Sequence, residues 1–209
     1  MLVAAFLLVT GCQGDKGSAG EGAAEKGICY TALGKDVESA VRRVAGIPDS
    51  VKITRYGNPE DSVDKLITMV AMGTPEKATR LEFCRFYRET VVSSPPVEVT
   101  FWGVREVPKR GADALGKSYR MAKGAAATSK LGVLYFECSS EEFSLGLGGA
   151  TKVLIRGESR TNDEVAESDA AAYEDNLRII HASSRVYAEL LGCEANAGIP
   201  ATFSMPPEV

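Results

Sequence analysis

Residues 132–138 read Gly132-Val-Leu-Tyr-Phe-Glu-Cys138, a short apolar run of the kind that forms a buried β-strand. Side chains alternate between the two faces of a strand. Leu134, Phe136 and Cys138 therefore share one face, and we expect that face to lie against a helix.

The segment from Ser168 to about Leu191 is the clearest helix of the chain, and Gly192 follows as a residue suited to end it. This ending brings Cys193 to the end of the helix, where it can clamp the helix onto the strand that carries Cys138. The face expected to be buried follows the helical period through Tyr173, Leu177, Ile180, Ser184, Tyr187 and Leu191.

The first half of the chain predicts helices and a hairpin. Asn58-Pro59 starts a helix, because a capping residue precedes a Pro at the first helical position. Two alternating runs around Pro95-Pro96 predict a hairpin, with a helix over 75–88 as an alternative. The elements expected are a helix over 35–45, a strand over 51–56, a helix from Asn58 to Gly73, and strands within 79–92 and 97–107.

The second half adds strands before the long helix. Residues 108–130 predict a surface connection with a helical piece near 112–123, and residues 151–156 predict a strand. We expect a glycine turn over 146–149, an acidic loop over 158–167 and an extended tail over 200–209. The order of elements indicates an α+β fold, with an antiparallel sheet, helices packed on one face and two disulfide-stapled halves.

Four cysteines, Cys29, Cys84, Cys138 and Cys193, remain when Cys12 is set aside, and an even number in an exported chain favours disulfides. Four cysteines allow three connectivities. Successive pairs are each separated by 55 residues, which favours Cys29–Cys84 and Cys138–Cys193. There is one His and no Cys-x-x-Cys motif, so neither a zinc site nor another cofactor is expected.

The amino terminus carries the pattern of an export signal. Residues 2–9 are an uninterrupted apolar run, which is too short to span a bilayer and is followed by Thr10-Gly11-Cys12. This stretch resembles the lipobox of bacterial lipoproteins, in which the Cys thiol receives diacylglycerol and cleavage leaves that Cys as the first residue. No basic residue precedes the run, so we expect the natural start to lie upstream of Met1.

The resemblance implies a division of the chain into three parts. Residues 1–11 would be the signal peptide, 12–28 the lipidated Cys12 with a Gly/Ala-rich tether, and 29–209 a single extracytoplasmic α+β domain. Together with Cys29, the helix near Asp36-Val37 and the strand with Cys84, the lipobox resembles the uncharacterised secreted lipoproteins of actinobacteria. That group implies a membrane anchor and no assigned chemistry.

The charge balance argues against nucleic acid as a partner. The chain has 24 Lys+Arg against 28 Asp+Glu, whereas phosphate binding needs an excess of clustered basic residues. The leading hypothesis is a lipid-anchored binding or accessory protein of the cell envelope, held at the membrane through Cys12. Its partner would be an unknown protein or small ligand. A purely structural envelope lipoprotein is a further alternative.

Candidate functional residues are few. A hydrolase triad would have to use His181, the single His, but no Gly-x-Ser-x-Gly nucleophile motif is present. Ser62-Val-Asp-Lys65 matches the Ser-x-x-Lys motif of penicillin-recognising enzymes without the other motifs of that family. Aromatic and Arg residues are enriched at binding hot spots, so we expect a recognition surface at Arg85, Arg88, Trp102 and Arg105 on the hairpin.

Overall fold

The computed structural model describes residues 29, 33–77, 80–89, 94–108, 116–145, 152–162 and 170–209. The predictions for the signal peptide, Cys12 and the tether lie outside the described residues. So do the expected turn over 146–149 and the cap of the long helix at Ser168. No helix of the described part is long and apolar enough to cross a membrane.

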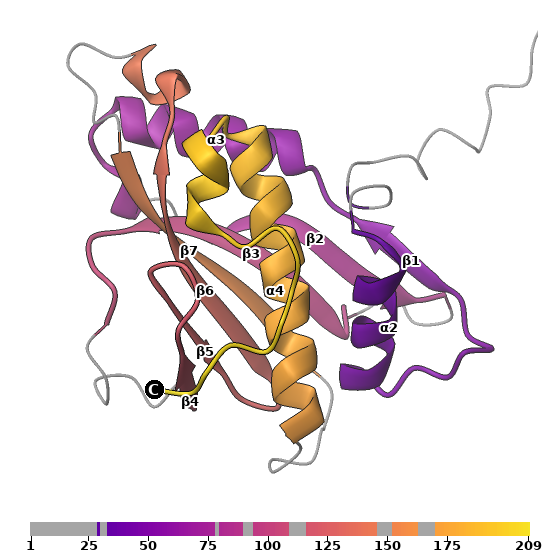
Figure 1. The fold of residues 1–209 in the computed structure, drawn as a ribbon. Coiled ribbons are helices and arrows are strands. Elements are labelled where there is room, and N and C mark those ends of the chain that lie inside the picture. Colours follow the sequence, from indigo (N-terminus) through magenta and orange to yellow (C-terminus); the bar gives the residue numbers. More distant parts are fainter. Residues whose placement is uncertain are drawn as a thin grey trace, which may run out of the picture.

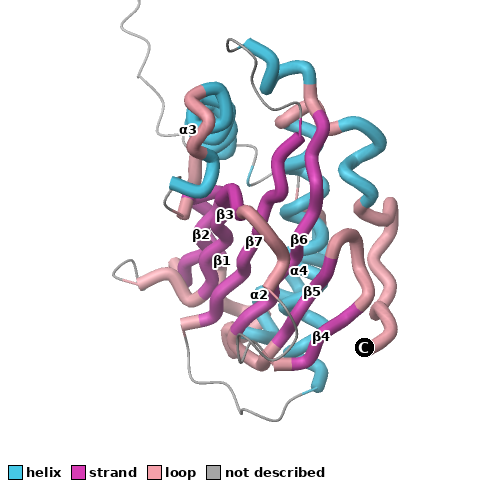
Figure 2. Tube along the Cα trace, turned by 90° about the vertical axis from the view of Figure 1, so that its left-hand side faces the viewer, coloured by secondary structure: helices cyan, strands magenta, loops and turns pink. Residues whose placement is uncertain are grey.

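A seven-stranded antiparallel sheet forms the centre of the fold (Figure 1). Its strand order is β1-β2-β3-β7-β6-β5-β4. Figure 2 shows β4 at the far end of this order, beside the carboxyl-terminal tail. The strands are β1 (Ile53–Tyr56), β2 (Leu81–Arg88), β3 (Val97–Val104), β4 (Lys117–Tyr119), β5 (Gly124–Ala127), β6 (Leu131–Ser139) and β7 (Lys152–Thr161).

The hairpin prediction is confirmed, and the alternative helix over 75–88 is wrong. Strands β2 and β3 pair antiparallel, and only a short 3₁₀ turn, η1 (Pro75–Lys77), precedes them. The register shifts between Glu82 and Cys84, a β-bulge that leaves both Phe83 and Cys84 buried. Simple alternation assigns these two neighbours to opposite faces, so the bulge is a feature that the sequence pattern missed.

The predicted helices form close to their expected limits. Asn58 begins one of them, because its Oδ1 accepts a hydrogen bond from the Asp61 backbone N–H at 3.2 Å. Gly192 adopts a φ of +64° just after the long helix, which is the left-handed conformation that glycine permits at a helix end. The helices are α2 (Lys35–Val44), α3 (Pro59–Ala71) and α4 (Ala170–Leu190), with 3₁₀ turns η2 (Glu141–Leu145) and η3 (Glu194–Gly198).

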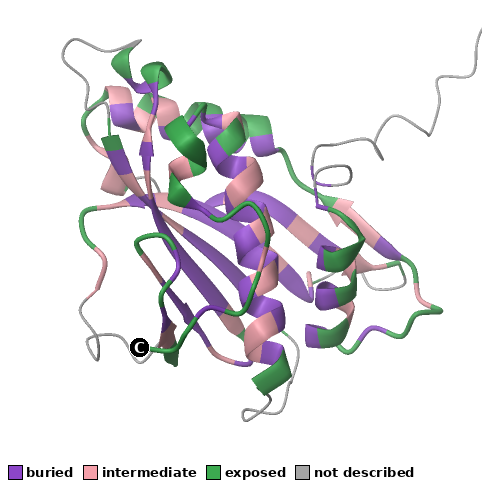
Figure 3. Cartoon of the chain, in the orientation of Figure 1, coloured by how far each residue is buried: buried purple, intermediate pink, exposed green. Residues whose placement is uncertain are grey.

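The core lies between the helices and the sheet. Helix α4 contacts β5, β6 and β7, α3 contacts β2 and β3, and α2 packs on α4. Aromatic side chains fill the space between α4 and the strands, where Tyr187 meets Phe83 and Phe101. Figure 3 shows the buried residues along the central strands and on α4. Apolar burial of this kind is the main favourable contribution to folding.

Two expectations for the second half are wrong. Strand β7 extends to Thr161, so Glu158 is a buried strand residue and not part of an acidic loop. Residues 117–119 and 124–127 are strands β4 and β5, where a helical piece and a connection were expected. Small Ala residues favour helix intrinsically, but pairing of β5 with β6 decides their conformation here.

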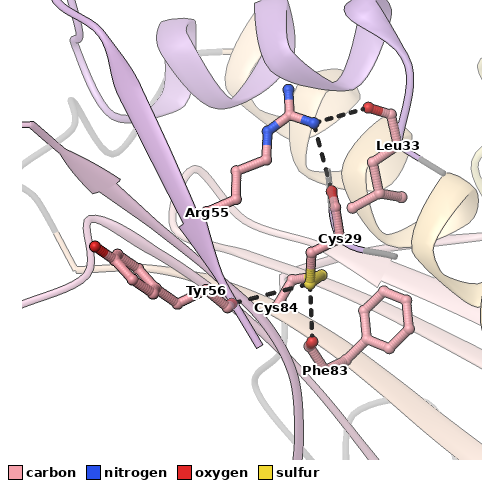
Figure 4. Close-up of a disulfide and its surroundings, with 6 residues drawn as sticks. All are labelled: Cys29, Leu33, Arg55, Tyr56, Phe83 and Cys84. Carbon is pink, nitrogen blue, oxygen red and sulfur yellow. Dashed lines mark hydrogen bonds between the residues drawn. A yellow bond between two sulfur atoms is a disulfide. The ribbon is translucent and has the colours of Figure 1, made fainter. Parts of the chain in front are cut away.

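Both disulfides follow the sequential pairing. Cys29 bonds to Cys84, and Cys138 bonds to Cys193. In the first bridge, Arg55 donates hydrogen bonds to the carbonyl oxygens of Cys29 and Leu33, at 3.4 and 3.2 Å (Figure 4). The second bridge joins Cys138, near the end of β6, to Cys193, which follows α4 directly after Gly192, as the glycine ending of the helix predicts.

Candidate functional site

The hairpin residues expected to form a recognition surface are not gathered in one place. Arg85 of β2 is paired in register with Glu98 of β3, so these two side chains share a sheet face. Trp102 lies four residues after Glu98 on β3 and therefore shares that face with Arg85. Arg88 points to the other side, where its guanidinium donates to the carbonyl oxygen of Ala45 at 2.8 Å. Arg105 follows β3 and forms an ion pair with Glu76 at 2.7 Å.

The sheet face that carries Trp102 holds a charged and aromatic cluster. The Arg156 guanidinium lies 5.1 Å from the Trp102 ring centroid and 5.6 Å from that of Tyr135. Glu158 accepts from Arg156 at 2.9 Å and from Arg160 at 2.6 Å, and Arg80 lies 3.5 Å away. The charge of Glu158 is thus neutralised within the cluster, which is consistent with a role in stability.

A cavity of about 700 Å³ lies where α2, α4 and the carboxyl-terminal tail meet. Its volume is in the range of small-molecule sites. The first residues of α2 form one wall, the middle of α4 forms another, and residues 201–203 of the tail form the third. The lining residues are Gly34, Lys35, Asp36, Val37, Arg178, His181, Ala182, Arg185, Val186, Glu189, Ala201, Thr202 and Phe203.

His181 forms part of the cavity wall from a buried position on α4. Its Nε2 lies 2.9 Å from the carbonyl oxygen of Pro200. A carbonyl oxygen only accepts, so Nε2 carries the proton in this contact. Burial lowers the pKa of His181, and the nearby charges of Arg185 and Arg178 lower it further. The imidazole is therefore neutral near pH 7.

Two arginines of α4 line the cavity on either side of His181. The Arg178 guanidinium lies 4.5 Å from the ring centroid of Phe203 and forms an ion pair with Glu174 at 2.7 Å. Arg185 forms no ion pair within the described part of the chain, and its Nη1 lies 3.5 Å from the carbonyl oxygen of Pro200. Arg185 is thus the cavity cation with the most donor capacity left for a ligand.

The start of α2 adds to the positive character of the cavity. Gly34 occupies the N-cap position and has no side chain that could accept from the first turn. The helix dipole also puts a partial positive charge at this end, next to Lys35. Asp36 and Glu189 are the carboxylates among the lining residues, and both are exposed.

The geometry does not assemble a hydrolase triad around His181 among the described residues. Thr202 is the single hydroxyl residue among those lining the cavity, and no Ser is among them. The Nε2 of His181, which would take the proton in such a triad, already faces a backbone carbonyl. The cavity suits binding better than nucleophilic catalysis.

A second cavity of about 530 Å³ lies between α3 and the start of β2, lined in part by Ser62 and Lys65. The Ser62 hydroxyl lies 3.3 Å from the Tyr187 hydroxyl, and Lys65 forms an ion pair with Asp61 at 2.6 Å. Burial raises the pKa of Tyr187 far above its usual range, so this phenol does not act as a base. The Ser-x-x-Lys pattern therefore has no activated nucleophile here.

The cavity beside His181 could have been suggested by the sequence of α4. Arg178, His181 and Arg185 are spaced by three and four residues, which brings polar side chains onto one helix face. The helical period of the same segment predicts only its buried, mainly apolar face. The part of the chain that the structure describes contains no group of His, Cys, Asp and Glu residues able to hold a metal ion.

Comparisons with protein families, with curated proteins and with solved structures find no match to this chain.

Proposed function

We propose that the protein is a lipid-anchored, extracytoplasmic binding protein of the cell envelope, and that its ligand occupies the cavity between α2, α4 and the tail. The observation that carries the binding role is this cavity of about 700 Å³, lined by charged and apolar side chains together. A purely structural lipoprotein has no need of such a cavity.

The proposed location rests on the sequence. The lipobox at Thr10-Gly11-Cys12 supports acylation of Cys12, and two disulfides are compatible with a compartment outside the reducing cytoplasm. A tether of about 15 residues would hold the domain on the order of 20 Å from the lipid. Anchoring raises the local concentration of a binding protein at the membrane.

We infer that α2, α3 and α4 all cover the same face of the sheet. Support comes from Tyr187 of α4, which stacks on Phe101 of β3 and hydrogen-bonds to Ser62 of α3. The cavity would then lie on the outer side of this helical layer, where a ligand can enter without opening the core.

Binding can be tested through His181, because the chain has no other His. Its imidazole signal in an NMR spectrum reports directly on the cavity. We expect members of a fragment collection containing cationic, neutral and anionic compounds to shift this signal at a saturable concentration. If no fragment of any charge shifts it, the cavity is not a binding site and the proposed binding role is wrong.

Anchoring has its own test. A basic segment is first placed before Leu2, since an export signal needs one. In a bacterial host that acylates lipoproteins, the detergent-extracted protein should then begin at Cys12 and carry the mass of a diacylglyceryl group. The Cys12→Ser variant should lose this mass and leave the membrane fraction. A full-length, unmodified chain in the wild type would contradict the proposed anchor without affecting the test of the cavity.

A further inference from the structure

We propose that the ligand of this cavity carries an oxyanion, a carboxylate or a phosphate, next to an apolar group. This inference rests on the proposed binding role and specifies the chemistry that the cavity recognises.

The charges around the cavity support an anionic group. Three cations, Arg178, Arg185 and Lys35, line the cavity, against the exposed carboxylates of Asp36 and Glu189. Arg178 is already paired with Glu174 outside the lining, so Arg185 and Lys35 are the cations of the described lining left to meet a ligand. Arg guanidinium groups bind carboxylates and phosphates through two parallel N–H donors.

The two arginines differ in how firmly they are held. Arg178 is fixed by its ion pair with Glu174 and by the Phe203 ring. Arg185, within the described part of the chain, makes only a long contact of its Nη1 with the carbonyl oxygen of Pro200, at 3.5 Å. We therefore assign the principal anion contact to Arg185. Arg178, paired with Glu174, holds the Phe203 ring in place, and the entropic cost of ordering a side chain on binding falls mainly on Arg185.

The opposite charges in the cavity do not cancel this preference. Asp36 lies in the first turn of α2, where the helix dipole stabilises its negative charge, and Glu189 lies one turn beyond Arg185 on α4. Neither carboxylate forms an ion pair with the three cavity cations in the described structure. Exposure to water weakens the field of both carboxylates and also that of Lys35, so the anion preference depends mainly on the half-buried Arg185.

The rest of the lining favours an organic anion over a bare ion. Phe203, Val186, Ala182 and Val37 contribute apolar surface beside the arginines. A cavity of about 700 Å³ is also far larger than a phosphate or acetate ion requires. A ligand with both groups can bury its apolar part against Phe203 while its oxyanion meets Arg185.

Benzoate and benzamide form a matched pair of probes, because they have nearly the same shape and differ in charge. We expect benzoate to shift the His181 signal with a Kd in the range of about 1 mM, and benzamide to bind at least tenfold more weakly. Benzoate should also raise the pKa of His181, because an added negative charge stabilises the imidazolium. Phenyl phosphate, used in a parallel titration, distinguishes a phosphate ligand from a carboxylate.

The matched variants are Arg185→Gln and Arg120→Gln. Each removes one positive charge, but Arg120 is exposed and does not line the cavity. Arg185→Gln should weaken benzoate binding about tenfold or more, and Arg120→Gln should leave it within about twofold. Circular dichroism of both variants checks that the fold is retained.

The possible results separate this inference from the proposed function. Equal binding of benzamide and benzoate, or binding of neutral fragments without either anion, would overturn the anion preference and leave the cavity as a binding site. An equal loss of affinity in both variants would attribute the effect to net charge and also overturn the assignment to Arg185. If no fragment of any charge binds, the proposed binding role fails as well.

Discussion

Tyr187 of α4 stacks face to face on Phe101 of β3, with ring centroids 4.0 Å apart and ring planes 7° from parallel. Its hydroxyl donates to the carbonyl oxygen of Ser62 at 3.2 Å and lies 3.3 Å from the Ser62 hydroxyl, which donates to it. One fully buried side chain thus ties the long helix both to the sheet and to α3.

Tyr187→Phe tests the polar half of this relationship. The substitution keeps the stacked ring but leaves the Ser62 carbonyl and hydroxyl without their partner in the core. We expect a loss of about 1–2 kcal/mol in the free energy of unfolding, measured by urea denaturation. Tyr56→Phe is the control, because Tyr56 is 49 % exposed, and it should change stability by less than about 0.5 kcal/mol. Equal stability of the two variants would show that the hydrogen bonds between Tyr187 and Ser62 do not stabilise the fold.

The same phenol predicts an alkaline loss of stability. Burial raises the pKa of Tyr187 far above 10, so the unfolded chain ionises first as pH rises. Its contribution to stability is complete below about pH 10 and falls above it. Above about pH 10, the free energy of unfolding should fall more steeply with pH for the wild type than for Tyr187→Phe. Parallel curves would show that another group dominates.

The lowered pKa of His181 predicts that stability also depends on pH at acidic values. Burial lowers its pKa in the folded state, so the unfolded chain binds a proton first as pH falls below about 6.5. Stability should therefore decrease from about pH 6.5 downward, and His181→Gln should remove that part of the decrease. The imidazole pKa is measurable by NMR in the intact protein, and a value at or above 6.5 would contradict this prediction.

The two disulfides offer an unusually well-matched comparison, because each closes a loop between cysteines 55 residues apart. In the loop-entropy model, each should contribute about 4 kcal/mol. We expect the double variants Cys29→Ala/Cys84→Ala and Cys138→Ala/Cys193→Ala to lose similar stability in urea denaturation. A large difference between the two losses of stability would contradict the loop-entropy model and would show that the local surroundings of each disulfide matter more than the length of the closed loop.

Loss of the Glu158 carboxylate, on the sheet face that carries Trp102, is expected to lower the stability of the protein. The Glu158 side chain is 2 % exposed and forms ion pairs with three guanidinium groups, of which that of Arg156 is the most buried. Glu158→Gln should lower the free energy of unfolding by about 2–4 kcal/mol in denaturation experiments, because it leaves the largely buried Arg156 charge without its carboxylate. Glu98→Gln removes a more exposed carboxylate from the same face and should cost less than about 1 kcal/mol.

Much of the fold could be predicted because local patterns and tertiary structure agree. The alternation in residues 97–104, the cap at Asn58 and the glycine after α4 are local signals that tertiary packing does not override. The equal cysteine spacing pointed to the observed connectivity. The bulge at Phe83 and the strand conformation of Ala125–Ala127 have no such local signal, since each depends on its pairing partner.

The polar face of α4 is visible in the sequence, but the complete cavity could not be predicted, because its other walls come from distant segments. Its walls come from α2 near one end of the described chain and from α4 and the tail near the other. Only packing of α2 on α4 brings Lys35 to the same space as Arg185. Likewise, strand alternation puts Arg85 and Arg88, three residues apart, on opposite faces, but nothing along the strand indicates that Glu98 and Ala45 are their partners.

The pairing of β3 with β7 runs through eight residue pairs, from Val97–Thr161 to Val104–Leu154. Strand β3 pairs on its other side with β2, which carries Cys84, and β7 lies between Cys138 and Cys193, so the two halves of the chain are not separable modules. A fragment that stops before β7 would present the whole length of β3 as an uncapped edge, open to pairing with another molecule. Division of this protein for expression or for fusion to a reporter should therefore avoid the interval between the two strands.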